Sequence, residues 1–179
     1  IIFYFNDHGV EAGKGTVYEG GVRSVSFVWA KNGIKGQRVV NTPVSNIDFA
    51  PTILDLCGLS ARPDVHDGKS LKPLIMGRTD HIHNSLYFEV GYTRAVLKDG
   101  WKYIALRPSA ELQSLTYEQR KAKLLEYNER RRAHGKKTTN ARPDEPFGHL
   151  GAVPGGSDID QRAMRGHEKH YFDADQLYN

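Results

Sequence analysis

Runs of apolar residues near the start of the chain predict two strands of an α/β core. Ile1–Phe5 is a short run of large, mostly apolar residues that leads into a polar Asn-Asp-His-Gly sequence, and Ser24–Trp29 is a second such run. Runs of this kind are typical of strands that are buried on both faces of a sheet. In open parallel sheets, ligand sites lie at the carboxyl ends of the strands, so Asp7 and His8 stand where we expect chemistry.

The segment 46–58 has the pattern of a short amphipathic helix. Asp48 is a candidate N-cap, Pro51 is tolerated in a first turn, and Gly58 is a typical C-terminal stop. Cys57 is the only cysteine, and we expect it to be a small buried hydrophobic residue. Apolar residues at helical spacing form the stripe that we expect to be buried, which consists of Phe49, Ile53, Leu56 and Cys57.

From residue 85 onward the hydrophobic period changes toward two, which predicts strands. Segments with this pattern are 86–89, 94–97 and 101–106. The Asp99-Gly100 pair between the last two is a strong signal for a tight hairpin turn. We therefore expect an antiparallel sheet, for which Gln176–Tyr178 is a candidate further strand.

A long polar stretch, residues 108–170, separates this hairpin from the last candidate strand. Thr116 and Gln119 have the spacing of a capping box, and the residues from there to Ala133 are good helix formers. One exposed helix is therefore expected. Residues 134–170 are rich in Gly, Pro and charge, and we expect them to form irregular loop.

The composition fits one ordinary globular domain or a piece of one. The 179 residues are 39% hydrophobic and 10% aromatic, which excludes disordered and collagen-like classes. No apolar run approaches the roughly 20 residues that span a bilayer, so no membrane span is expected. We expect residues 1–84 to form the end of an α/β core, with a second short helix near residues 71–76. Residues 85–179 are expected to form an antiparallel C-terminal subdomain that carries the insertion 108–170.

Basic charge is concentrated in one segment of the chain. Residues 116–137 contain eight Lys and Arg against three Glu, a local charge of +5, whereas the whole chain carries only +4. The rest of the chain therefore sums to −1. Because the basic character is local, the overall charge does not predict a nucleic-acid partner.

Three polar side chains near the start of the chain are candidates for chemistry. Asp7 and His8 either supply oxygen and imidazole ligands to a divalent cation or form a polar pair that caps a loop. Lys14 lies between two glycines, in a stretch with four glycines in nine residues whose backbone can approach a ligand closely. It either contacts an oxyanion as a point charge or is a solvated loop lysine.

Several segments, taken in order, carry a family resemblance. The first ones are Asn6-Asp-His-Gly9, Gly13-Lys-Gly-Thr-Val-Tyr-Glu-Gly-Gly-Val-Arg23 and Pro43-Val-Ser-Asn-Ile-Asp-Phe-Ala-Pro-Thr-Ile-Leu-Asp-Leu-Cys-Gly58. Later ones are Asp67-Gly-Lys-Ser-Leu-Lys-Pro-Leu74, Arg94-Ala-Val-Leu97, Trp101-Lys-Tyr-Ile104 and Gln176-Leu-Tyr-Asn179. Together they closely resemble the second half of the type I sulfatases, of the alkaline-phosphatase-like superfamily. The resemblance implies the C-terminal part of a sulfatase-type α/β/α sandwich, followed by a small antiparallel sheet subdomain with a helical and loop insertion.

The resemblance also implies an activity and a set of site residues. Type I sulfatases hydrolyse sulfate esters with a hydrated formylglycine nucleophile and a calcium ion. By this mapping Asp7 and His8 are the later pair of calcium ligands, Lys14 contacts the sulfate oxygens, and Glu19 and Arg23 hold the loop in shape. The substrate would be a sulfated small molecule, such as an aryl or steroid ester, or a sulfated polysaccharide, and the location would be periplasmic, secreted or lysosomal.

The sequence also departs from the family pattern. Neither Cys57 nor any serine stands in the Cys/Ser-x-Pro-x-Arg motif from which formylglycine is made. We therefore expect the nucleophile and the first calcium ligands to lie before Ile1, in an N-terminal half that is the chain's main partner. Alone, the chain is expected to hydrolyse no sulfate ester. Two alternatives stay open: a phosphate or phosphonate ester hydrolase of the same superfamily, and a non-catalytic fragment whose +5 helix binds an acidic polysaccharide or another polyanion.

Overall fold

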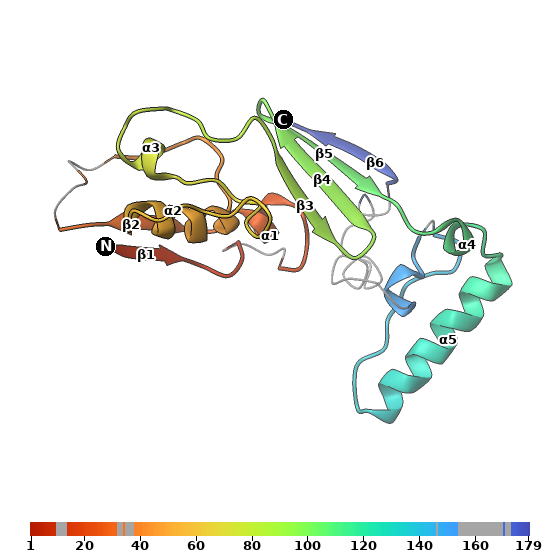
Figure 1. Cartoon of the computed structure of the whole chain (residues 1–179). Helices are drawn as coiled ribbons and strands as arrows, with labels where there is room; N and C mark the ends of the chain where they lie inside the picture. The colour runs from red at the N-terminus through yellow and green to blue at the C-terminus, as the bar shows by residue number, and fades with distance from the viewer. Residues whose placement is uncertain (10–13, 32–33, 35–37, 146, 154–169, 171–172) are drawn as a thin grey trace. The chain divides into compact units, whose positions relative to one another are not determined.

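The computed structural model describes residues 1–9, 14–31, 34, 38–145, 147–153, 170 and 173–179 (Figure 1). The chain divides into two compact units. Unit 1 comprises residues 1–7 and 24–86, and unit 2 comprises residues 8–23 and 87–179. The division into domains 1–84 and 85–179 that the sequence suggests stays a prediction about the intact protein, and in this structure the segment 8–23 groups with the later residues.

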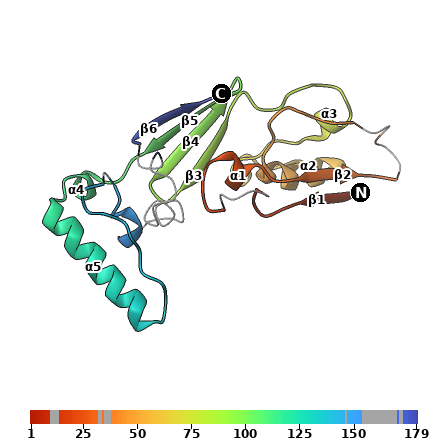
Figure 2. The same ribbon diagram turned by 180° about the vertical axis from the view of Figure 1, so that it is seen from behind.

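Unit 1 is built from a two-stranded sheet and a helix that packs against it. Its elements are β1 (Ile2–Phe5), β2 (Ser26–Trp29), the 3-10 helix η1 (Asn46–Asp48), α2 (Phe49–Leu56) and α3 (Lys72–Ile75). Strands β1 and β2 pair in antiparallel fashion, from Ile2 opposite Trp29 to Phe5 opposite Ser26. Helix α2 lies alongside this pair (Figures 1 and 2), and the ring of Phe49 contacts those of Phe3 and Phe5 at centroid distances of 5.7 and 4.9 Å.

Both predicted strands form, but the expectation that they are buried on both faces of a sheet is wrong for the structure as described. The two strands are antiparallel, and Ile2, Phe27 and Trp29 are 54%, 53% and 53% exposed. A strand is buried on both faces only where a layer covers each face. In the described structure α2 supplies such a layer through Phe49, and many of the remaining large side chains of the pair face solvent.

Helix α2 ends where the sequence predicts, but its buried face is rotated from the predicted stripe. Gly58 adopts φ +76°, a conformation that favours glycine, and terminates the helix as expected. Phe49 and Thr52 are buried, whereas Ile53 and Cys57 are exposed, so the predictions for these two residues are wrong. The buried face includes Thr52 because its hydroxyl donates to the Asp48 carbonyl (2.6 Å) and accepts from the Leu71 N–H (2.7 Å). A buried polar group is stable in this position because both of its bonds are made.

Unit 2 is organised around a four-stranded sheet of order β3-β4-β5-β6. The strands are β3 (Leu86–Val90), β4 (Thr93–Lys98), β5 (Trp101–Leu106) and β6 (Asp175–Tyr178). The hairpin between β4 and β5 is confirmed, because Asp99 and Gly100 have φ values of 51° and 82°, as a type I′ turn requires. Strand β6 pairs antiparallel with β5, which confirms the predicted last strand.

The insertion in unit 2 contains the long helix that the capping box predicts. Helix α5 (Tyr117–Ala133) begins at Thr116, whose hydroxyl accepts from the Gln119 N–H, while the Gln119 side chain accepts from the Thr116 N–H. Two short elements accompany it, α4 (Ala110–Gln113) and η2 (Leu150–Ala152). Leu106, Leu150 and Val153 form a small core there. The predicted loop 134–170 lies only partly within the described residues, since 146 and 154–169 fall outside them.

Candidate functional site

The two candidate metal ligands come directly after β1. Asp7 is exposed and His8 is partly buried. The Asn6 N–H donates to the Val25 carbonyl (3.1 Å), which extends the β1–β2 pairing to the residue before Asp7. His8 Nδ1 lies 2.5 Å from its neighbouring Gly9 carbonyl oxygen. When Nδ1 donates to this oxygen, the imidazole lone pair is on Nε2, which is the arrangement seen in most metal-ligating histidines.

Close packing of glycines joins the His8-Gly9 segment to the candidate sulfate loop. The Gly9 N–H donates to the Gly21 carbonyl at 2.8 Å. A Cβ atom at Gly9 would lie 2.3 Å from the Gly20 carbonyl oxygen, so no other residue fits without moving the backbone. Glycine is therefore required at position 9 for close approach, and His8 is held beside the segment 18–21 within unit 2.

The loop that carries Lys14 is anchored by the residues after it. Lys14 is exposed, and Gly15 adopts φ +80°. Thr16 and Val17 are then buried, Val17 in a cluster with Ala95 and Ile104 of the sheet. The loop expected through Gly21 instead ends in a short helix, α1 (Glu19–Val22), which begins after the extended Tyr18.

Lys102 of β5 fastens this loop to the sheet. Its side chain is almost fully buried and lies over the ring of Phe88, with Nζ 5.1 Å from the ring centroid. The ammonium group donates to the Val17 carbonyl (3.0 Å) and to Glu19 Oε1 (2.5 Å). The Tyr18 hydroxyl adds a bond to Gln176 of β6. Glu19 therefore shapes the loop, as expected, and its partner Lys102 is a residue that the sequence does not single out.

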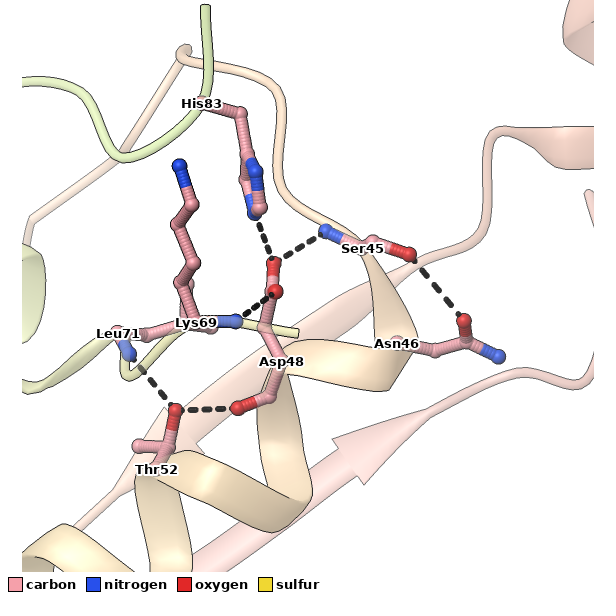
Figure 3. A network of polar contacts seen from close by, with 7 residues as sticks. All are labelled: Ser45, Asn46, Asp48, Thr52, Lys69, Leu71 and His83. Carbon is pink, nitrogen blue, oxygen red and sulfur yellow. Dashed lines mark hydrogen bonds and ion pairs between the residues drawn. The ribbon is translucent and has the colours of Figure 1, made fainter. Parts of the chain in front are cut away.

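A second polar network lies in unit 1, around the buried carboxylate of Asp48 (Figure 3). Asp48 Oδ2 accepts from the Ser45 N–H and from His83 Nε2, and Oδ1 accepts from the Lys69 N–H, each at 2.8 Å. Asp48 stands directly before α2, but its side chain makes no N-cap bond to that helix, unlike the prediction; instead it ties η1 to the segments around residues 69 and 83. The fit is tight, because a Cβ at Gly68 would lie 2.1 Å from the Ile47 carbonyl oxygen.

An ion pair fastens the next turn of the same segment to α2. Lys72 Nζ lies 2.8 Å from Asp55 Oδ1, and the Ser70 hydroxyl donates to Asp55 Oδ2 at 2.6 Å. These two donors hold the pKa of the Asp55 carboxyl below its usual value. The Asp67-Gly-Lys-Ser-Leu-Lys-Pro-Leu74 sequence is thus bound to α2 at several points, which identifies its role as structural.

The chemistry of the candidate site residues allows them to supply part of a metal or oxyanion site. Within the described ranges, no group of three His, Cys, Asp or Glu side chains is arranged to hold a metal ion. Asp7 supplies a carboxylate and His8 an imidazole, so the chain offers two adjacent donors, one of them the hard oxygen that calcium prefers. Calcium takes six to eight oxygen ligands, so the remaining donors would come from elsewhere.

Comparison with known proteins gives these residues a family context. A family model described as N-sulphoglucosamine sulphohydrolase, C-terminal, matches residues 7–105, which is more than half of the chain. The match includes Asp7, His8, Lys14 and Lys102, whereas the whole of the insertion 108–170 lies outside it. In the helices that the structure describes, none is long and apolar enough to cross a membrane.

Sulfatases from several animals are similar to the same chain over shorter lengths. It is 36% identical over 91 residues to the extracellular sulfatase SULF-1 homolog of Drosophila melanogaster, covering 47% of this chain and 8% of that protein. It is 37% identical over 78 residues to rat steryl-sulfatase (42% and 13%) and 34% identical over 84 residues to human arylsulfatase A (46% and 16%). The chain thus spans less than a fifth of the length of each of these relatives. On this evidence the chain belongs to the family of N-sulphoglucosamine sulphohydrolase C-terminal regions, that is, to the C-terminal part of the sulfatases.

Proposed function

We propose that the intact protein containing this chain hydrolyses sulfate esters. The observation that carries this proposal is the family match over residues 7–105, which includes the loop Gly13–Gly21 with Lys14 near its start. The anchoring of that loop by Lys102 supports it, because a residue that contacts a reacting group must be held on a fixed scaffold. The substrate would be a sulfated small molecule or a sulfated polysaccharide.

Lys14 is proposed to contact the oxygens of the sulfate group. Negative charge builds up on the leaving oxygen as the S–O bond breaks, and a fixed cation stabilises it more in the transition state than in the ground state. The compact ammonium of a lysine between two glycines can approach the sulfate without obstruction from neighbouring side chains.

Asp7 and His8 are proposed to hold a calcium ion as the later pair of its ligands. The ion would supply positive charge beside the sulfate oxygens. Asp7 offers a carboxylate oxygen at the end of β1, and His8 offers Nε2 when Nδ1 donates to the Gly9 carbonyl. Gly9, packed against Gly20, would keep the imidazole in this position.

The nucleophile is proposed to be a formylglycine from residues outside this chain, because the sequence contains no Cys/Ser-x-Pro-x-Arg motif. The exposed side chains of β1 and β2 fit the same proposal, since the further layers of an α/β/α sandwich would cover them. One of the similar proteins is described as extracellular, and we propose that this protein, too, acts after export, in a periplasmic, secreted or lysosomal location.

The test is a turnover assay of the intact protein on an aryl sulfate and on the matching aryl phosphate. We expect turnover of the sulfate, and we expect Asp7→Ala to lose bound calcium and turnover together. The control is Asp67→Ala, an exposed aspartate that should leave both unchanged. Preferential hydrolysis of the phosphate would instead identify a phosphate ester hydrolase, and full calcium content in Asp7→Ala would refute the ligand assignment.

A further inference from the structure

The end of helix α5 and the turn after it form a cationic surface that lies outside the family match. The eight residues Arg130–Lys137, here named the cationic turn, contain five Lys and Arg, one His and no acidic residue. They belong to the insertion in unit 2, and the matched region ends at residue 105. The sulfatase assignment therefore does not account for them.

Backbone hydrogen bonds fold the two halves of the cationic turn together. The Gly135 N–H donates to the Arg132 carbonyl (3.0 Å), and the Lys136 N–H donates to the Arg131 carbonyl (2.8 Å). With Gly135 at φ +64°, these two bonds form a Schellman motif. The chain therefore turns back on the helix instead of leading away, which brings Lys136 close to the last helical turn.

Side chains fix the same geometry. The Arg131 guanidinium donates to the Lys137 carbonyl and lies over the ring of Tyr127, with Cζ 5.5 Å from the ring centroid. Further along, the Asn128 amide makes a reciprocal pair with the backbone of Thr139, accepting from its N–H (2.8 Å) and donating to its carbonyl (3.3 Å). The returning chain is thus clamped to α5, and the cations are preorganised.

The positive charge of the cationic turn is largely uncompensated within the described structure. Arg130 comes within 4.0 Å of Glu126 at an exposed site, which is a weak ion pair. Across the described residues, no carboxylate pairs with Arg132, Lys136 or Lys137. The negative end of the helix dipole favours some positive charge at this end of α5. However, the last carbonyls of the helix already accept backbone hydrogen bonds, so the dipole alone does not explain a cluster of five Lys and Arg.

From this geometry we propose that the cationic turn binds a sulfated polysaccharide. The proposal rests on the proposed function, because a sulfatase that acts on a polymer gains from a surface that holds the chain. Arginine forks and lysine ammonium groups bind sulfate as they bind phosphate, and a short Lys/Arg-rich segment is a typical heparin-binding pattern. A single-stranded nucleic acid fits less well, since Tyr127 lies beneath Arg131 and the turn itself offers no Phe, Tyr or Trp on which bases stack.

The experiment measures binding of the intact protein to immobilised heparin, with no turnover involved. The test variant combines Arg132→Gln, Lys136→Gln and Lys137→Gln, whose side chains make no hydrogen bond or ion pair within the described part of the chain. The control variant combines Lys31→Gln, Lys69→Gln and Lys98→Gln, three exposed lysines elsewhere whose replacement removes the same charge. Because each ionic contact releases counterions, we expect the test variant to bind about tenfold or more weakly at low salt, with a shallower salt dependence.

Each outcome decides the proposal. Weaker heparin binding by the test variant, with control binding near that of the wild type, supports it. Equal losses in both variants would show a general effect of net charge and would overturn it, as would single-stranded DNA that binds more tightly than heparin. Turnover of a small aryl sulfate is measured separately and should be unchanged in both variants. If no variant or wild type turns over that ester, the proposed function fails, while the binding result still stands by itself.

Discussion

Each unit contains a buried charged side chain that holds a neighbouring segment in place, Asp48 in unit 1 and Lys102 in unit 2, but the partners of the two charges differ. In unit 1 the Asp48 carboxylate is 0% exposed, and its partners are two backbone N–H groups and the His83 imidazole. In unit 2 Lys102 is 5% exposed, but its charged partner Glu19 has a side chain that is 58% exposed. The Asp48 carboxylate is therefore fully enclosed by the fold, whereas the ion pair of Lys102 reaches the protein surface through Glu19.

The buried network around Asp48 contains none of the candidate site residues. The Asp48 network joins η1, α2 and the segment 69–71, none of which carries a candidate site residue. Lys102 fastens the loop that comes after Lys14. We therefore expect changes around Asp48 to affect mainly stability and changes at Lys102 to affect mainly the proposed activity.

The largest loss of stability is expected for Asp48→Ala. This change removes the acceptor of three partly buried hydrogen bonds, those donated by the Ser45 N–H, the Lys69 N–H and His83. Such a loss costs about 3–5 kcal/mol of the free energy of unfolding, measured by urea denaturation. Asp64→Ala is the control, because Asp64 pairs with Arg62 at an exposed site and should leave the unfolding midpoint unchanged. Similar midpoints for the two variants would show that the enclosed Asp48 carboxylate contributes no more to stability than an exposed one.

Gly68→Ala should destabilise the same network by crowding. The added methyl would lie 2.1 Å from the Ile47 carbonyl oxygen, so the backbone on one side must move, at a cost of about 2–3 kcal/mol. Gly58→Ala is the matched comparison, since a Cβ there meets open space and the cost of about 1 kcal/mol comes from the positive φ alone. If Gly68→Ala cost no more than Gly58→Ala, the segment around residue 68 would not be as tightly held as described.

Lys102→Met should lower the free energy of unfolding less than Asp48→Ala does, and it should affect the proposed activity more. Glu19 can be hydrated once the ammonium is gone, and only the Val17 carbonyl loses a buried donor, so we expect about 1–2 kcal/mol. Hydrogen exchange should become faster in residues 14–23 but not in 45–52. Lys98→Met, an exposed lysine at the hairpin end of the same sheet, is the control. Unchanged exchange in the loop would show that Lys102 does not anchor it.

The smallest expected effect is a pH dependence at His149. Burial lowers the pKa of this histidine, and the nearby charges of Arg120 and Lys123 lower it further. A histidine whose pKa is lower in the folded state binds protons more readily when unfolded, so stability falls as the pH drops below the unfolded value of about 6.5. His149→Gln should flatten this part of the stability profile, measured as the difference in unfolding midpoint between pH 7.5 and 5.5. A profile identical to that of the wild type would contradict the assignment.

Local chemistry explains which parts of this fold the sequence predicts. The Asp99-Gly100 turn, the Thr116 capping box and the Gly58 stop all depend on neighbours within a few residues, and all three are confirmed. The contacts of Asp48 with Lys69 and His83 span 21 and 35 residues, and only the tertiary fold brings them together. The exposure of Ile53 and Cys57 escapes prediction for the same reason, because the face of α2 that is buried depends on what packs against it.

The candidate site divides in a similar way. Asp7, His8 and Lys14 stand in a recognisable order of motifs, and sequence alone identifies them as candidates. Lys102 also lies in one of these segments, Trp101-Lys-Tyr-Ile104, but nothing in that segment predicts its role, because its bond to Glu19 crosses 83 residues. The only hint that the sequence offers of this role is that Lys102 is a polar residue on the face of the predicted strand that also carries Ile104 and Leu106.

The proposed chemistry of this chain depends most on Lys14, which we propose contacts the sulfate ester. The most direct test is kcat/KM of the intact protein for an aryl sulfate, comparing the wild type with Lys14→Ala and Lys14→Arg. We expect the alanine variant to lose about 2–4 kcal/mol of transition-state stabilisation, with an unchanged unfolding midpoint, and the arginine variant to recover only part of it. Wild-type kcat/KM in a folded Lys14→Ala protein would contradict this role and leave Lys14 a loop residue.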